Sequence, residues 1–206
     1  MYALITDGSI TKHINGNKGI TIGDIQYPRS IFTLWSEAER NAIGIYVITV
    51  DTTNKKDEQW YINTNVSYGV ESNKAVGSYG TATAKAHADT LFTAQDETDG
   101  LGTEGELATR GLKYNLIQTV KAQAAGILQD TDWYVVRKAD AGTAVPSAIT
   151  THRAAVRTKA AEQETLITNA SNTPALETLY TYVNTADEGD PVVMERPLGE
   201  FPVLGS

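Results

Sequence analysis

Residues 131–146 read TDWYVVRKADAGTAVP, and residues 153–157 continue as RAAVR. Short polar residues before Trp133 are typical of a helix start, because their side chains accept hydrogen bonds from the first free amides. Gly142 is suited to end that helix, and Pro146 marks the start of the next one. The stretch therefore predicts two helices joined by a short turn. Trp-Tyr-Val-Val could also form a strand, but helix is the favoured interpretation.

Apolar residues recur at helical spacing on both sides of this block. Upstream, leucines and small apolar residues between 103 and 128 repeat at four- or five-residue steps, which predicts an amphipathic helix of about 25 residues. Downstream, Ile149, Val156 and Ile167 mark the narrow apolar face of a helix that ends near Ala170. Another helix is predicted to begin at the Thr-Pro step at 173. The C-terminal half is therefore predicted to be a helical array.

The first 70 residues carry strand and turn signals. Asp7-Gly8 lies between two apolar runs and suits the two-residue turn of a hairpin. Ser36 and Glu39 have the spacing of a capping box, which predicts a short helix over about 37–43. Residues 45–50 are β-branched or aromatic and predict a strand, with 60–68 as its partner strand. This module is predicted to be a small mixed sheet with one helix.

The fold class predicted from these patterns is α+β. A β-rich module (1–70) is followed by a glycine-rich connector (71–102), with a short helix near 84–92, a helical region (103–185) and an extended arm (186–206). The arm contains three prolines, which rule out a continuous helix, and its apolar residues could anchor it on another surface. The residues predicted to contact partners or other copies are Ile149, Val156, Ile167, Val192, Met194, Leu198, Phe201 and Val203.

Composition bounds the classes of function. The chain has 206 residues, no cysteine and a formal charge of −8. Disulfides, thiolate metal sites and cysteine nucleophiles are thus excluded. We expect no nucleic-acid partner, because phosphate binding needs clustered cations, and no membrane insertion, because no apolar run approaches about 20 residues.

No catalytic, metal-binding or cofactor-binding residues are predicted. The histidines at 13, 87 and 152 lack the spacing of metal ligands and are expected at the surface. Asp130 and Asp132 are better explained as helix caps than as a glycosidase pair. The basic residues between Arg137 and Lys159 are expected on a solvent-exposed, salt-bridged helix face rather than in an anion site.

The block of residues 128–157 resembles the C-terminal helical region of tailed-bacteriophage tail-fibre and tail-fibre-assembly proteins. In that pattern a T-D-W opening is followed by a small-residue turn with proline and by a helix with R-x-x-V-R, here Arg153 to Arg157. A weaker resemblance covers residues 1–50, carried by Tyr27-Pro28, the capped segment at 36–43 and Gly44-Ile45-Tyr46-Val47.

The resemblance implies a non-enzymatic structural protein of the phage tail. It would be a fibre or fibre-attachment subunit at the tail or baseplate, made in the host cytoplasm and built into the virion. Its expected partners are other phage tail proteins and further copies of itself, with a trimer favoured. Two alternatives stay open: a tail-fibre assembly chaperone absent from the virion, and a host-glycan-binding module using Trp60, Tyr61, Tyr68 and Tyr79.

Overall fold

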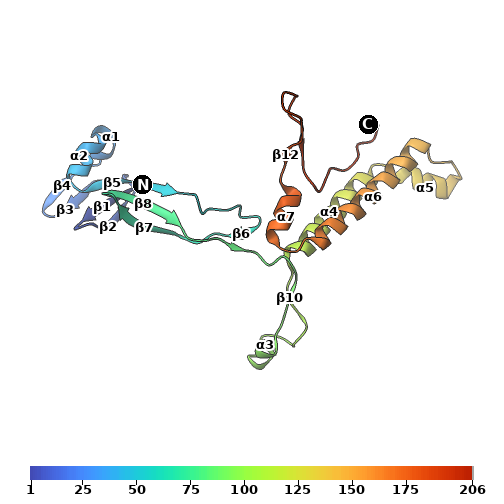
Figure 1. Ribbon diagram of the computed structural model, residues 1–206, viewed down its shortest axis with the longest axis horizontal. Helices are drawn as coiled ribbons and strands as arrows, with labels where there is room; N and C mark the ends of the chain where they lie inside the picture. The colour runs from blue at the N-terminus through green and yellow to red at the C-terminus, as the bar shows by residue number, and fades with distance from the viewer. Residues whose placement is uncertain (206) are drawn as a thin grey trace. The chain divides into compact units, whose positions relative to one another are not determined.

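A computed structural model describes residues 1–205, so that Ser206, the last residue of the predicted arm, lies outside the described residues. The chain divides into two compact units, Met1–Thr83 and Ala84–Ser206. The first is rich in strands and the second contains the long helices (Figure 1). The predicted α+β class is confirmed.

A five-stranded sheet with the order β2-β1-β5-β8-β7 forms the first unit. Its strands are β1 (Tyr2–Thr6), β2 (Ser9–Ile14), β5 (Ile45–Asp51), β7 (Val66–Glu71) and β8 (Lys74–Tyr79). The β1–β2 hairpin is confirmed, with Asp7 and Gly8 both at positive φ. The two edge strands also approach each other, since the rings of His13 and Tyr68 lie 4.5 Å apart. The sheet is thus strongly curved.

The partner predicted for the 45–50 strand is wrong. β5 lies between β1, which is antiparallel to it, and β8, which is parallel to it. Residues 60–68 divide instead between the short β6 (Tyr61–Ile62) and the start of β7. The hairpin β7–β8 turns at Ser72 and Asn73, both at positive φ, inside the segment predicted to be a connector. Without glycine, this turn gives a weaker sequence signal than Asp7-Gly8.

Short elements cover one end of the first sheet. They are the hairpin β3 (Ile20–Ile22) and β4 (Ile25–Tyr27), then α1 (Ile31–Leu34) and α2 (Glu37–Ala42). The predicted capping box at Ser36 and Glu39 is confirmed. A core of buried apolar residues joins these elements to the sheet: Ile14, Ile20, Ile31, Phe32 and Ile45.

The second unit begins with a long hairpin. After β9 (Thr83–Ala84), β10 (Thr90–Leu91) pairs with β11 (Leu107–Thr109), and α3 (Ala94–Thr98) lies between them. The helix predicted near 84–92 is therefore absent at that position. A capping box formed by Thr93 and Asp96 starts α3 further along the chain.

The helix predicted to start near 103 starts at Leu112. α4 (Leu112–Gln129) has Gly111 as its N-cap, where a Cβ atom would lie 2.2 Å from the carbonyl carbon of Ala88. The two backbones cross closely here, where the hairpin ends and α4 begins. α5 (Asp132–Ala141) and α6 (Ser147–Asn169) follow as predicted, with Gly142 in the left-handed conformation at the end of α5.

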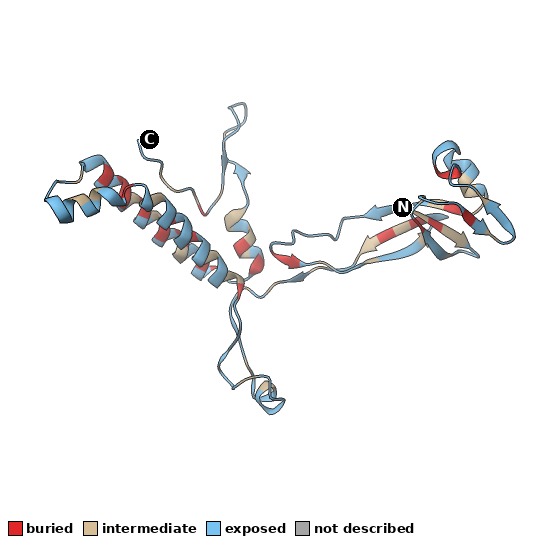
Figure 2. Cartoon of the chain, turned by 180° about the vertical axis from the view of Figure 1, so that it is seen from behind, coloured by how far each residue is buried: buried red, intermediate tan, exposed pale blue. Residues whose placement is uncertain are grey.

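The helices α4 and α6 pack antiparallel. Lys113 near the start of α4 donates to the carbonyl of Thr168 near the end of α6, and Arg153 of α6 reaches the other end of α4. Val120 and Ala124 of α4 are buried, as are seven residues of α6 (Figure 2). α7 (Thr173–Tyr180) and the short hairpin β12 (Val183–Asn184) and β13 (Met194–Glu195) complete the unit.

Candidate interaction surfaces

Arg153 joins the two helices of the 131–157 block to α4. Its guanidinium donates to the Leu128 carbonyl at 2.8 Å and to the Thr131 hydroxyl at 2.6 Å, and forms an ion pair with Asp132 at 2.8 Å. The Leu128 carbonyl lies in the last turn of α4, where a cation is favourable because the carbonyls there lack helical partners. One side chain therefore holds the end of α4 and the start of α5 against α6.

Two expectations about this block are wrong. Arg153 is buried rather than solvent-facing. Thr131, the residue at the start of α5, makes no capping bond to the helix, and its hydroxyl donates to the Leu128 carbonyl and accepts from Arg153. Asp132 is the first residue of α5 and serves as the partner of Arg153. Sequence spacing could not reveal this arrangement, because Leu128, Asp132 and Arg153 belong to three different helices.

The other basic residues take three different environments. Lys159 pairs with Glu162 at 3.4 Å, as expected of a salt-bridged helix face. The guanidinium of Arg137 lies 4.7 Å from the ring centroid of Trp133 and 5.4 Å from that of Tyr134, within range of a cation–π interaction. Lys138 and Arg157 are exposed, and no salt bridge between described residues includes either of them.

A concavity of about 310 Å³ between α5 and α6, which we call the basic pocket, has three cations in its lining. It is lined by Lys138, Arg153 and Arg157, by Thr150 and by an apolar wall of Val135, Ala144 and Val145. None of the described residues that line it is acidic, and one of its three cations, Arg153, is already paired with Asp132. The geometry suits a carboxylate or another anion with an apolar neighbour.

α5 itself is an exposed helix. It has no buried residue, and Trp133 and Val136 are 51% and 65% exposed (Figure 2). Exposed Trp133 lies beside the half-buried Tyr134 and Arg137, and these three residue types are enriched at the centre of protein interfaces.

The residues predicted to contact partners fall into two groups. Ile149, Val156 and Ile167 are buried inside the second unit by the chain's own helices. They stabilise the α4–α6 pair and are not a free surface.

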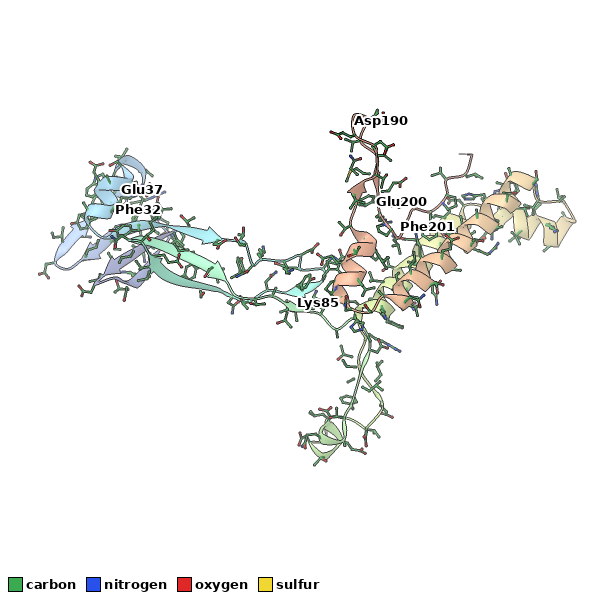
Figure 3. The ribbon with its side chains drawn as sticks, in the orientation of Figure 1. Phe32, Glu37, Lys85, Asp190, Glu200 and Phe201 are labelled. Atoms are coloured by element: carbon green, nitrogen blue, oxygen red, sulfur yellow. The ribbon has the colours of Figure 1, made fainter. Side chains whose placement is uncertain are left out.

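The arm is docked on its own chain. Leu198 is buried, its amide donates to the Leu179 carbonyl, and the Gln163 side chain donates to the Gly199 carbonyl at 3.0 Å. Residues 201–205 then run along α6 past the buried His152, which was expected at the surface, and Phe201 is half-buried there (Figure 3). Val192, Met194 and Val203 remain exposed.

The aromatic residues considered for glycan binding do not share an exposed face. Trp60 and Tyr61 are buried, and the ring of Tyr68 contacts His13. Tyr79 lies under the ammonium of Lys55, 5.8 Å from its ring centroid.

Among residues 1–205, no cluster of three or more His, Asp or Glu side chains is arranged to hold a metal ion. Within the same range, every helix is too short or too polar to cross a membrane. Comparison with known proteins finds no matching family model, no similar curated protein and no matching solved structure.

Proposed function

We propose that this chain is a non-enzymatic structural subunit of a bacteriophage tail, a fibre or fibre-attachment protein at the tail or baseplate. In this role it associates with copies of itself, with a trimer favoured, and with other tail proteins. The resemblance of residues 128–157 to tail-fibre and tail-fibre-assembly proteins supports the class. The amount of surface that one chain exposes supports a role in assembly.

That exposed surface carries the proposal. The chain exposes 13354 Å². A compact monomer of 22.2 kDa exposes about 9,400 Å². Two separate compact domains of about 9 and 13 kDa, the shares of the two units, would together expose about 11,300 Å². The chain exposes about 2,000 Å² more than these two separate compact domains would, and this excess exceeds two standard interface halves of about 800 Å² each.

Parts of the exposed surface are apolar, and in an isolated chain these side chains contribute no free energy of burial. In the second unit, the exposed large apolar residues include Leu91, Leu101, Leu107, Trp133, Val135, Val136, Val183, Val192, Val193, Met194 and Val203. They concentrate on the two hairpins and on α5. A subunit that buries these elements against neighbours in a particle would lose this exposure.

Mass spectrometry of purified particles tests the proposal. We expect peptides of this chain at a fixed ratio to the other tail proteins, and labelled antibodies should bind the tail in electron micrographs. If the chain is absent from particles but co-purifies with unfinished fibres, the assembly-chaperone alternative replaces the proposal.

A further inference from the structure

A second charged surface complements the basic pocket. The segment 90–109, which we call the acidic hairpin, contains no lysine or arginine and five carboxylates: Asp96, Glu97, Asp99, Glu104 and Glu106. No salt bridge between described residues includes any of these carboxylates. They make only local hydrogen bonds; Asp96, for example, caps α3 together with Thr93. The hairpin therefore carries a concentrated negative charge, and the arginine that follows it, Arg110, is paired with Asp89 instead.

The acidic hairpin also carries exposed apolar side chains. Leu101, next to its acidic turn, is 64% exposed, and Leu91 and Leu107 on its strands are exposed as well. The basic pocket offers the matching set of groups: Lys138 and Arg157 are exposed cations, and Val135 and Val145 form part of its apolar wall. Charge and apolar contacts thus match between the two surfaces.

In one copy of the chain, the two surfaces lie toward opposite ends of α4. The acidic hairpin ends just before the N-terminal end of α4, and α5 follows its C-terminal end (Figure 1). α4 has 18 residues, so about 27 Å of helix lies between the end of the hairpin and the start of α5. Asp89 accepts hydrogen bonds from the Arg110 side chain and from the Gly111 amide. These bonds hold the base of the hairpin at the start of α4.

We propose that the acidic hairpin of one copy binds the basic pocket of a second copy. The carboxylates of the hairpin bind Lys138 and Arg157, and Leu101 packs on the apolar wall and on α5. Because each copy then uses two different surfaces, the contact is head-to-tail, and it closes into a ring when the rotation between copies allows it. This inference rests on the self-association in the proposed function, and it names the two surfaces that carry it.

Charge reversal in the full chain tests this pairing. Glu104→Lys with Glu106→Lys changes two carboxylates whose side chains accept no hydrogen bond from the described residues, and Lys138→Glu with Arg157→Glu reverses the charge of the pocket. Sedimentation velocity over a range of concentrations should show that wild-type chains associate and that 500 mM salt weakens the association relative to 50 mM. Each double reversal should weaken association about tenfold or more. The chain that carries all four reversals should associate again.

Matched controls separate pairing from net charge and from folding. Glu188→Lys with Asp190→Lys makes the charge change of the hairpin reversal at another exposed hairpin. Lys12→Glu with Lys18→Glu makes the charge change of the pocket reversal in the first unit. Both should leave association unchanged, and far-ultraviolet circular dichroism should be the same for all variants.

The pairing is overturned if wild-type chains stay monomeric, if either reversal has no more effect than its control, or if the fourfold variant fails to associate. Mass spectrometry of particles tests the proposed function separately, so the pairing can fail while the chain is still found in the tail.

Discussion

Replacing Arg153 with methionine should destabilise the second unit by about 3 kcal/mol. The change removes two hydrogen bonds from a charged donor, and such bonds contribute about 1.5–3 kcal/mol each. The ion pair with Asp132 adds little, because that aspartate side chain is 56% exposed and exposed pairs contribute about 0.2–1 kcal/mol. Methionine fills part of the volume of the buried arginine stem and offsets some of the loss.

Arg157→Met is the matched control. This arginine lies one turn further along α6, is exposed, and makes a single hydrogen bond of 3.4 Å to the Arg153 carbonyl. Its replacement should change the free energy of unfolding by less than about 0.5 kcal/mol.

Urea unfolding, followed by circular dichroism at 222 nm, measures both variants, because the long helices that give this signal all belong to the second unit. Hydrogen exchange read by mass spectrometry gives the local effect. Amides of α5 should lose protection in Arg153→Met while amides in the middle of α4 keep theirs. If the two variants have equal stability, or if α5 stays as protected as in wild type, Arg153 does not hold these helices together.

Three further predictions follow from local geometry. Gly111→Ala should lower stability by about 2 kcal/mol or more, because its Cβ would collide with the Ala88 backbone. Gly126→Ala should raise stability by up to about 1 kcal/mol, since nothing lies within 4 Å of that position. Urea unfolding that changed stability in the same direction for both variants would refute this. Asp89→Asn should be less stable than wild type at pH 7, and the difference should vanish on acidification. The hydrogen bond from the Gly111 amide, followed by that from Arg110, holds the pKa of Asp89 below its usual value, so the stabilisation is present above about pH 4 and is lost as the pH falls through the folded pKa. A pH series of thermal unfolding in which the gap stays constant would contradict that assignment. Leu198→Ala should cost about 2–4 kcal/mol and expose the tail to limited proteolysis, whereas Val203→Ala, at an exposed position, should leave cleavage unchanged.

Local signals in the sequence predicted local structure well. Asp7-Gly8 specified a hairpin, Ser36 and Glu39 a capped helix, and the glycine and proline at 142 and 146 the turn between α5 and α6, because each of these depends on residues a few positions apart. The partner of β5 was missed for the opposite reason. A parallel strand pair depends on residues 27 positions apart, such as Thr49 and Val76, and leaves no local pattern.

The candidate surfaces were less predictable than the elements. Helical spacing placed Ile149, Val156 and Ile167 on one face but could not say whether that face met a partner or α4. Arg153 and Arg157 share one face by spacing, yet one is buried and the other exposed, because Leu128 and Asp132 approach α6 from different helices. Burial is a property of the packed unit rather than of the pattern.

The parallel pairing of β5 with β8 also sets the order in which the first unit can form. When residues 1–51 have been synthesised, β1 and β2 can already form their hairpin, and β5 can add beside β1. The other edge of β5 then stays open until β8 is made, and β8 starts 23 residues after Asp51. Such an edge, with Ile48 and Val50 on it, can pair with a neighbouring chain. The rate at which the β7–β8 hairpin closes over it should therefore determine how much newly made protein aggregates at high expression levels.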